Sequence, residues 1–557
     1  MQEDTQSFEE NADVDDQHPI SRYMKKADDE LKAYEDGISR TFKETVDKYR
    51  RKYGRHPPPG FRDWYKFARE KAVHNIDDFE QIMDDIRPFW GMKPSLIRTY
   101  AALLGADSDN GISALRIRNK KIWNTTFQNW RMETMRRMVE PFVKYLPDMD
   151  IAMNREDQPR IVVPWDDMQA LLKKESETRR IAVASEASWT TNMTGFYREG
   201  VDSPKPDFKF EHIAGKQYML TLKEACPPES PARNNVTDLA SVEALYKDPN
   251  GGFITNFNTS TDLCVMGHGI EDKHGIMFAA STLQNTPLLL PIFSECKVNV
   301  NSDILFPANM YYMDDERYVY DPKNDYTWDD KYDKLMWRGS TSGGTNTAEN
   351  WRGMHRNRLA FFANATVMAD KTVLIMGQDP EKPGTYQNVE NYNPTKFLEE
   401  HTDVGFTGTD SCVPNCDFYS DIFLFKEKVA MSEQFRSKYL VDVDGASFSG
   451  RWRAFLQSKS LGIKATIFKE WHTSRLIPWR HFVPLDNRFD ELYGILTYFI
   501  GLGKATEVHY SGEPYVQRHD FEARRIANQG REWASKVLRN DDIEVHNLSS
   551  HVTSVHC

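Results

Sequence analysis

Hydrophobic and polar residues alternate along the chain with two different periods. Apolar residues recur at helical spacing in four stretches, residues 79–90, 122–146, 489–503 and 521–540. Short continuous apolar runs, typical of buried strands, occupy residues 160–165, 372–377, 438–445 and 461–468. Helices therefore alternate with buried strands, most clearly after Lys331, and this order predicts α/β layers.

The N-terminal region is polar and highly charged. The first two dozen residues are acidic and are predicted to be disordered. From Lys25 to Tyr53 the charges are dense and mixed in helical composition, and Gly54 with the HPPPG breaker at 56–60 ends the pattern. We interpret this segment as a stem or strapping helix.

The length of the chain indicates its number of domains, and its net charge argues against some classes of function. A chain of 557 residues is too long for one core, so two principal domains with tails are expected. The net charge of -12 argues against non-specific binding to nucleic acid or to an anionic membrane. No apolar run reaches the length of a membrane span and the first residues lack a signal-peptide core, so we expect any membrane anchor to be missing from this chain.

Cysteines and glycosylation sequons point mildly to a secretory lumen. Cys412 and Cys416 form a CxxxC pair, which is weak evidence for zinc and more typical of a disulfide or of two free core thiols. Six Asn-X-Ser/Thr sequons are present, at Asn124, Asn192, Asn235, Asn258, Asn364 and Asn547. A polar chain of this length also contains several sequons by chance.

Three arginine-containing segments lie at or beside predicted strand ends. They are KLMWRGSTSGG with Arg338, NWRGMHRNRLAFF with Arg352, Arg356 and Arg358, and VDGASFSGRWRAFLQSKSLGIK with Arg451 and Arg453. Arginine binds phosphate oxygens in a bidentate manner, and glycines allow a backbone to approach a ligand closely. Each segment alone is also typical of a turn or of a solvated helix face. The evidence for a phosphate site is that three such arginine-containing segments occur.

The same segments exclude two phosphate-binding motifs. Neither the P-loop spacing nor a G-x-G-x-x-G after a strand occurs in the chain, which disfavours nucleoside triphosphates and dinucleotides. A nucleotide diphosphate-sugar remains compatible with the pattern.

Several ordered segments resemble glycosyltransferase family 90, the capsule-associated-protein group that includes fungal β-1,2-xylosyltransferases and protein O-glucosyltransferases. They are MNREDQPR, FSECKVNVNSDILFP, KLMWRGSTSGG with MHRNRL, DVGFTG, KYLVDVDGASFSGRWRAFLQSKSLGIK and EWHTSRLIPWRHFVPLD, between Met153 and Asp486. WRGSTSGG followed by Asn-Trp-Arg looks most like the fungal branch.

The resemblance implies a GT-B architecture with two Rossmann-like domains facing across a cleft. The expected units are a disordered or helical stem (1–60), an N-terminal acceptor-side domain (61–325), a C-terminal UDP-sugar domain (326–505) and a C-terminal helix crossing back with a tail (506–557). Composition and periodicity alone indicate only α/β layers.

The resemblance also implies transfer of a sugar from a UDP-sugar with inversion, which needs a base on the acceptor hydroxyl. The family's base precedes a proline in an Asn-x-x-Asp-x-Pro pattern, which assigns the role to Asp157, with Glu156 as the neighbouring alternative. Gln158 stands where the protein-modifying branch carries an aromatic residue. We therefore expect a glycan acceptor rather than a folded protein domain.

For the UDP moiety, the resemblance implies three arginines and a few small or acidic residues. They are Arg338, Gly339, Ser340, Arg356, Ser449, Arg451 and, for the ribose hydroxyls, Glu470. We interpret DVDG (442–445) as a strand-to-loop turn, so no obligatory metal is expected, although manganese could assist. His268, His274 and His481 lack ligand spacing and are interpreted as structural, and Asp303 is a candidate for the acceptor side.

The function expected from the sequence is that of an inverting UDP-sugar-dependent glycosyltransferase in the Golgi lumen, with UDP-xylose favoured as donor and mannose as acceptor. A protein O-glucosyl- or xylosyltransferase is the first alternative. Others are a non-catalytic glycan-binding protein on a transferase scaffold and a cytosolic nucleotide-binding scaffold.

Overall fold

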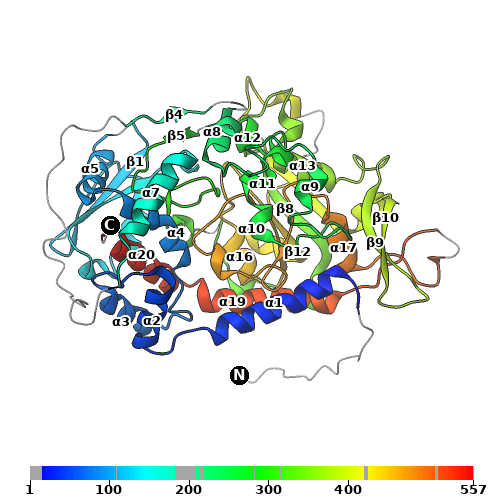
Figure 1. Ribbon diagram of the computed structural model, residues 1–557. Coiled ribbons are helices and arrows are strands. Elements are labelled where there is room, and N and C mark those ends of the chain that lie inside the picture. The colour runs from blue at the N-terminus through cyan, green and yellow to red at the C-terminus, as the bar shows by residue number, and fades with distance from the viewer. Residues whose placement is uncertain are drawn as a thin grey trace.

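The computed structural model describes residues 16–555, except for 108, 182–207, 214, 216, 282, 314, 316, 420–424 and 509–511. These residues form a mixed α/β structure with two five-stranded sheets and helices around them (Figure 1). The predicted α/β class is confirmed. Expectations for the first 15 residues, Asn192 and Cys557 concern positions outside the described residues.

The charged N-terminal segment forms two helices where one was expected. Helix α1 (Pro19–Asp36) begins with proline and ends at Gly37, and α2 (Phe42–Tyr53) starts at its N-cap Thr41. Gly54 closes α2 with φ 63°, as its position after the charged run predicts. The prediction of disorder is wrong from Pro19 onward, because Ile20 and Met24 are buried on the protein.

The first sheet is mixed, in the order β2-β1-β3-β6-β7. Its strands are β1 (Ile112–Arg118), β2 (Lys121–Thr125), β3 (Met149–Asn154), β6 (Ile292–Ser294) and β7 (Ile304–Leu305). Strands β2, β1 and β3 pair antiparallel, while β3, β6 and β7 run parallel. The start of the predicted helix 122–146 is therefore strand β2, and the predicted strand 160–165 reduces to one bridge between Ile161 and Thr286.

Among the described residues, ten α-helices follow α2 in the first half of the chain, three of them before β1 and the others in the connections between the strands of this sheet. They are α3 (Phe61–Glu70), α4 (Glu80–Ile86), α5 (Pro94–Leu104), α6 (Trp130–Val139), α7 (Trp165–Glu177), α8 (Gln217–Ala225), α9 (Leu239–Glu243), α10 (Phe257–Ser260), α11 (Leu263–Ile270) and α12 (Gly275–Phe278). A separate two-stranded pair is formed by β4 (Glu211–His212) and β5 (Gln284–Asn285).

The second sheet is parallel throughout, in the order β11-β8-β12-β13-β14. Its strands are β8 (Tyr332–Ser340), β11 (Thr402–Gly408), β12 (Ser437–Val443), β13 (Leu461–Ala465) and β14 (Val483–Pro484). Numbered within this sheet, the order is 2-1-3-4-5, a doubly wound order that reverses between β8 and β12. The predicted strands 438–445 and 461–468 are confirmed as β12 and β13.

The connections of the second sheet include an antiparallel hairpin, β9 (Val373–Gln378) with β10 (Tyr386–Tyr392). The predicted strand 372–377 is thus a strand, in this hairpin and outside the parallel sheet. The helices are α13 (His355–Phe362), α14 (Thr395–His401), α15 (Met431–Gln434), α16 (Trp452–Gln457) and α17 (Leu492–Ile500).

The last two helices connect the second half back to the first. Helix α19 (Asp520–Val537) packs against α16, α17 and β13, and α20 (Asn540–Val555) packs against α3, α4 and α6. Figure 1 shows α1 running beside α19, where Arg525 pairs with Asp28. Every described helix is too short or too polar to span a lipid bilayer.

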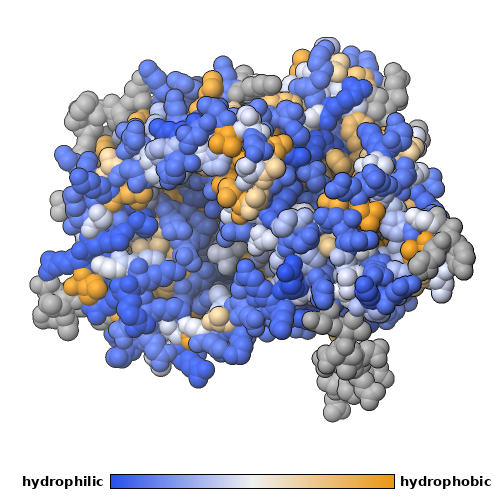
Figure 2. All heavy atoms as spheres, turned by 45° about the vertical axis from the view of Figure 1, so that its right-hand side comes forward, coloured by the Kyte–Doolittle hydropathy of each residue, from blue (hydrophilic) through white to orange (hydrophobic). Residues whose placement is uncertain are grey.

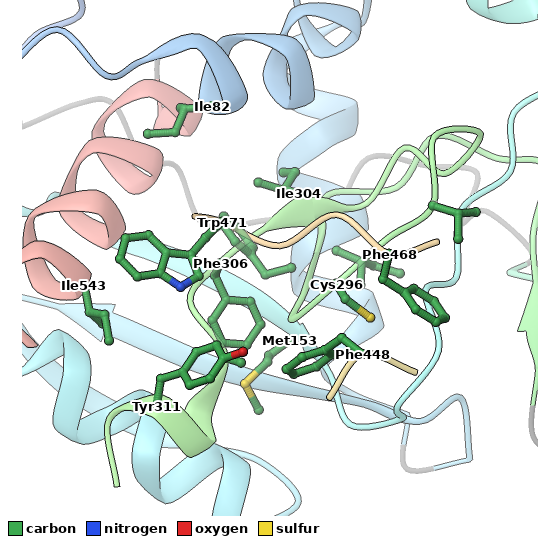
Figure 3. Close-up of a cluster of buried hydrophobic side chains, with 14 of the residues drawn as sticks. Ile82, Met153, Cys296, Ile304, Phe306, Tyr311, Phe448, Phe468, Trp471 and Ile543 are labelled. Atoms are coloured by element: carbon green, nitrogen blue, oxygen red, sulfur yellow. The ribbon is translucent and has the colours of Figure 1, made fainter. Parts of the chain in front are cut away.

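Buried hydrophobic side chains form two clusters, and one of them joins the two halves. In that cluster Met153 of β3 and Cys296 lie with Phe448 and Phe468, which come from loops after β12 and β13 (Figure 3). Side chains on the face shown in Figure 2 are mostly hydrophilic, with scattered hydrophobic patches. The shared core fixes the loops of the second sheet against the end of β3.

Candidate functional site

The carboxyl ends of β8 and β12 carry most of the residues predicted to bind a diphosphate. Arg338, Gly339 and Ser340 end β8, and Ser449 and Arg451 follow β12. These two strands are neighbours at the point where the strand order reverses. In doubly wound sheets the crevice at such a point is the usual ligand site.

Direct hydrogen bonds hold these residues together. The Arg356 guanidinium reaches the end of β8, where Nη1 donates to the Ser340 carbonyl at 3.1 Å and to Ser342 Oγ at 2.7 Å. Arg451 Nη1 donates to the Arg338 carbonyl at 2.6 Å and its Nε to Ser449 Oγ at 3.3 Å. The structure thus brings the separated sequence segments into one cluster.

Arg356 and Arg451 flank the buried indole of Trp337. Each guanidinium carbon lies 5.6 Å from the centre of that ring. Gly445 lets Arg356 approach the loop after β12, because a Cβ at residue 445 would lie 2.9 Å from Arg356 Nη2. Arg356 Nε also donates to the Asp444 carbonyl at 2.7 Å.

The two guanidiniums form no ion pair with a carboxylate among the residues that the structure describes. Burial, and then the neighbouring Arg451, lower the pKa of Arg356 to about 9, and burial lowers the pKa of Arg451. Two like charges out of water are unfavourable unless an anion joins them. The arrangement is therefore suited to binding an anion.

Arg338 differs from the other two arginines because its charge is already paired. Its Nη2 donates to both carboxylate oxygens of Asp403, at 2.7 and 2.8 Å. Lys426 shares the same carboxylate and helps to lower the pKa of Asp403. The backbone of Arg338 belongs to the cluster, whereas its guanidinium is directed to Asp403.

The carboxylates of the DVDG segment, Asp442 and Asp444, have partners inside the protein. Asp442 accepts from Lys464 Nζ at 3.0 Å. Asp444 accepts from Thr466 Oγ1 at 2.6 Å and from the Ile467 amide at 2.9 Å. Across the described ranges, no three His, Cys, Asp or Glu side chains are arranged to hold a metal ion.

The turn that carries Asp157 follows β3 and is organised by Asn154. The Asn154 amide donates to the Gln158 carbonyl at 2.8 Å, and its oxygen accepts from the Glu156 amide at 3.1 Å. The Asn154 side chain thus hydrogen-bonds the backbone of its own turn at two points. This accounts for the asparagine in the Asn-x-x-Asp-x-Pro pattern. Asp157 is left on the surface, with 48% of its side chain exposed.

Gln158 connects this turn to the cluster at the end of β12. Its Nε2 donates to the Ala446 carbonyl at 2.8 Å, and the side chain is buried. Ala446 lies in the same loop as Ser449. Gln158 is therefore an interface residue between the two halves, and it places the Asp157 turn beside the loop of the arginine cluster.

Arg131, at the start of α6, holds the Asp157 carboxylate and was not predicted. It donates to Asp157 Oδ1, to the Arg155 carbonyl at 2.7 Å and to the buried Glu295 at 3.2 Å. Burial alone would lower the pKa of Arg131, but the two carboxylates more than offset this and raise it. The signal available in the sequence was only an arginine after an Asn helix cap, which is common.

Glu470 lies after β13 and is buried with close partners. The Tyr311 hydroxyl donates to its Oε2 at 2.6 Å, and Lys464 Nζ lies 3.6 Å from Oε1. Burial raises the pKa of Glu470 to about 7. Its assignment to the ribose hydroxyls stays a prediction, and its described contacts are with the protein.

The remaining candidates have structural contacts. Asp303 accepts from the amides of Arg160 and Ile161, each at 2.9 Å, directly behind the Asp157 turn. His274 stacks on His355 with ring centres 4.0 Å apart, and His481 stacks on Trp533. His268 lies 3.1 Å from Glu271.

Two disulfides are present among the described cysteines, Cys226–Cys264 and Cys412–Cys416. The second resolves the CxxxC pair in favour of a disulfide. Cys296 is free and buried, and its Sγ lies 3.6 Å from the Asp157 carbonyl.

A comparison with known families gives a match to part of the chain. The family model described as Glycosyl transferase family 90 matches residues 419–549, roughly a quarter of the chain. This span includes β12, Ser449, Arg451 and Glu470, whereas Arg356 and Asp157 lie outside it. The match supports the family resemblance and a glycosyltransferase activity.

Proposed function

We propose that the chain is an inverting glycosyltransferase that moves a sugar from a UDP-sugar to a hydroxyl group of a glycan. The observation that carries the proposal is the pair of guanidiniums of Arg356, which is buried, and Arg451, which is half-buried, at the reversal point of a doubly wound sheet and without an ion-paired carboxylate among the described residues. A diphosphate would accept hydrogen bonds from both guanidiniums directly. The family match supports the same chemistry.

In the proposed mechanism the two halves act as the two domains of a GT-B enzyme. Arg356, Arg451 and the amides near Gly339 and Ser340 bind the diphosphate and stabilise the charge that develops on it as the sugar leaves. Asp157 accepts the proton of the acceptor hydroxyl. That hydroxyl oxygen forms the new bond to the anomeric carbon as the bond to the diphosphate oxygen breaks, which inverts the configuration.

Arg131 fits this role for Asp157. It binds Oδ1 and orients the carboxylate, while Oδ2 has no hydrogen bond to a described residue and can receive a hydroxyl proton. Glu295 in turn holds Arg131. Arg131 is therefore a positioning residue for the proposed base.

We propose UDP-xylose as the donor and a mannose hydroxyl as the acceptor, on the basis of the fungal resemblance. Xylose and glucose differ by one hydroxymethyl group, and such a difference changes binding by only about 1–3 kcal/mol. A screen of UDP-sugars for transfer to mannosides distinguishes the donors. Transfer to a folded protein domain alone would favour the protein-modifying alternative, and glycan binding without turnover would favour the non-catalytic one.

The linkage of the product tests inversion. From an α-linked UDP-xylose we expect a β-xyloside, because a single displacement with Asp157 as the proposed base inverts the anomeric carbon. Proton NMR of the product measures the anomeric coupling, which is large for the β anomer. A small coupling would contradict inversion and call for a nucleophile in the protein.

We also propose that the protein works in the secretory pathway, in the Golgi lumen. Two disulfides support an oxidising compartment. The sequon residues Asn124, Asn235 and Asn258 are exposed, Asn364 is half-buried and Asn547 is buried in α20. The folded chain therefore offers at least three accessible acceptor sites.

From a secretory host, peptide mapping after enzymatic deglycosylation is expected to show modified asparagine at one or more of Asn124, Asn235 and Asn258. Asn547 serves as the internal control, because it is inaccessible once α20 has packed. A native protein unmodified at all three exposed sites would favour the cytosolic alternative.

A further inference from the structure

We propose that Trp130 is a stacking platform for a pyranose ring of the acceptor, beside the carboxylate of Asp157. This inference rests on the proposed function, because it assigns the acceptor site of that reaction. Two observations support it. Trp130 is exposed, and the guanidinium of Arg131 contacts both the Trp130 ring and the Asp157 carboxylate.

Trp130 is one of two exposed tryptophans among the described residues, the other being Trp123. Trp130 is the first residue of α6, and 45% of its surface is accessible, whereas Trp337, Trp351, Trp452 and Trp471 are fully buried. The N-cap Asn129 accepts from the Met132 amide at 2.9 Å and fixes the start of the helix. Aromatic side chains are enriched at binding surfaces.

The ring of Trp130 lies next to the proposed base. The Arg131 guanidinium carbon is 4.7 Å from the centre of the Trp130 ring. The same guanidinium donates to Asp157 and to Glu295. One planar group therefore contacts both the aromatic ring and the carboxylate, so a molecule resting on Trp130 lies within reach of Asp157.

A second aromatic residue lines the same area. The Arg155 guanidinium carbon lies 5.3 Å from the centre of the Phe127 ring, and Arg155 is two residues before Asp157. Phe127 has a left-handed φ of 48°, and its carbonyl accepts from Ser113 Oγ at 3.1 Å. A non-glycine residue in this conformation is uncommon and must be held by its surroundings. The chain thus directs two aromatic rings to the region of the Asp157 turn.

A pyranose ring matches this chemistry better than a peptide or a free anion. The face of an indole ring is electron-rich, and the C–H groups on one face of a sugar carry partial positive charge. The sugar hydroxyls at the ring edge find a donor in Arg131 and an acceptor in Asp157. Gln158 is buried and donates to the Ala446 carbonyl, so acceptor selection falls to the exposed residues around Asp157.

The test compares Trp130→Ala with a matched control, Trp123→Ala. Trp123 is also exposed, at 63%, but its ring lies 5.7 Å from Arg118, which donates to the Met149 carbonyl at the opposite end of β3 from Asn154. Two quantities are measured: binding of α-1,2-mannobiose by saturation-transfer NMR and calorimetry, and the KM values for acceptor and UDP-sugar. UDP binding and thermal stability report whether each variant is folded.

We expect Trp130→Ala to weaken mannobiose binding and raise the acceptor KM by about tenfold, with the UDP-sugar KM unchanged, and Trp130→Phe to recover most of the loss. Trp123→Ala should behave like the wild type. Unchanged mannobiose binding and acceptor KM in Trp130→Ala would overturn the platform, as would an absence of mannobiose binding by the wild type. Loss of binding in Trp130→Ala from a protein that transfers no sugar would support the platform and refute the transferase.

Discussion

Asp157→Asn is expected to lower the rate of sugar transfer by about 10²–10⁴-fold, the usual contribution of a general base. Asparagine has the same shape and can still accept a hydrogen bond from Arg131, so the turn should keep its conformation. It cannot take up the hydroxyl proton. UDP affinity should stay close to the wild-type value, because Asp157 is not a phosphate contact.

The matched control is Glu156→Gln, one residue earlier in the same turn. The Glu156 carboxylate lies beside Gly111 and Arg160, where a Cβ added to Gly111 would meet Glu156 Oε1 at 3.2 Å. Its neighbours therefore differ from those of Asp157, which is paired with Arg131. Retained transfer by Asp157→Asn together with an inactive Glu156→Gln would move the base by one residue.

Arg131→Lys tests whether Arg131 positions Asp157, because this variant keeps the proposed base and changes only the residue that holds it. Lysine keeps the positive charge but cannot bind Asp157, Glu295 and the Arg155 carbonyl with one planar group. A positioning role would show as a lower kcat with an altered pH profile and an unchanged KM for the UDP-sugar. A merely structural role would show as lower thermal stability with a normal pH profile.

The second sheet could be predicted from the sequence because its strands are continuous apolar runs. In β12 every residue from Ser437 to Val443 is buried, and such a run is typical of a strand covered on both faces. The glycine- and serine-rich loops after β8 and β12 mark strand ends, so the segments with Arg356 and Arg451 could be grouped before their distances were known. The pairing of Arg338 with Asp403 could not, since it depends on the alignment of β8 with β11.

The first sheet was harder to predict because its strands are short or lie at the edge. Strand β2 falls inside a helical pattern, and the turn before it has Asn119 and Lys120 at φ 52° and 61°. Two positive φ values are the mark of a tight hairpin, and Asn at the first position is a typical signal for it. The second position of this turn is usually glycine but is Lys120 here, so the sequence did not indicate a hairpin.

Arg131 illustrates why part of the site was not predictable. It lies 26 residues before Asp157 in the chain and belongs to no motif. Three tertiary contacts define its role, namely those with Asp157, the Arg155 carbonyl and Glu295. Glu295 is itself held by the Asn309 amide at 2.7 Å. Such a network depends on how α6 packs near the ends of β3 and β6, which local patterns do not encode.

Arg356→Ala and Arg451→Ala are each expected to weaken UDP binding by roughly 1.5–3 kcal/mol, about 10- to 150-fold in Kd. Arg356 is buried and Arg451 is half-buried, both lie beside Trp337, and neither forms an ion pair with a carboxylate among the described residues, so their charges are available to the diphosphate. Arg352→Ala is the control, because Arg352 belongs to the same segment but is exposed and stacks on Trp351. It should bind UDP like the wild type.

Treatment with a chelator completes this test. It shows whether the arginines or a divalent metal ion neutralise the charge of the diphosphate. Calorimetry in excess EDTA should leave UDP binding by the wild type measurable, since Asp442 and Asp444 are engaged by Lys464, Thr466 and the Ile467 amide. Arg356→Lys should lose affinity even though it keeps the charge, because the bidentate fork is lost. Complete loss of UDP binding in EDTA, with both arginine variants binding normally, would make DVDG a metal site and remove the arginine pair from the mechanism.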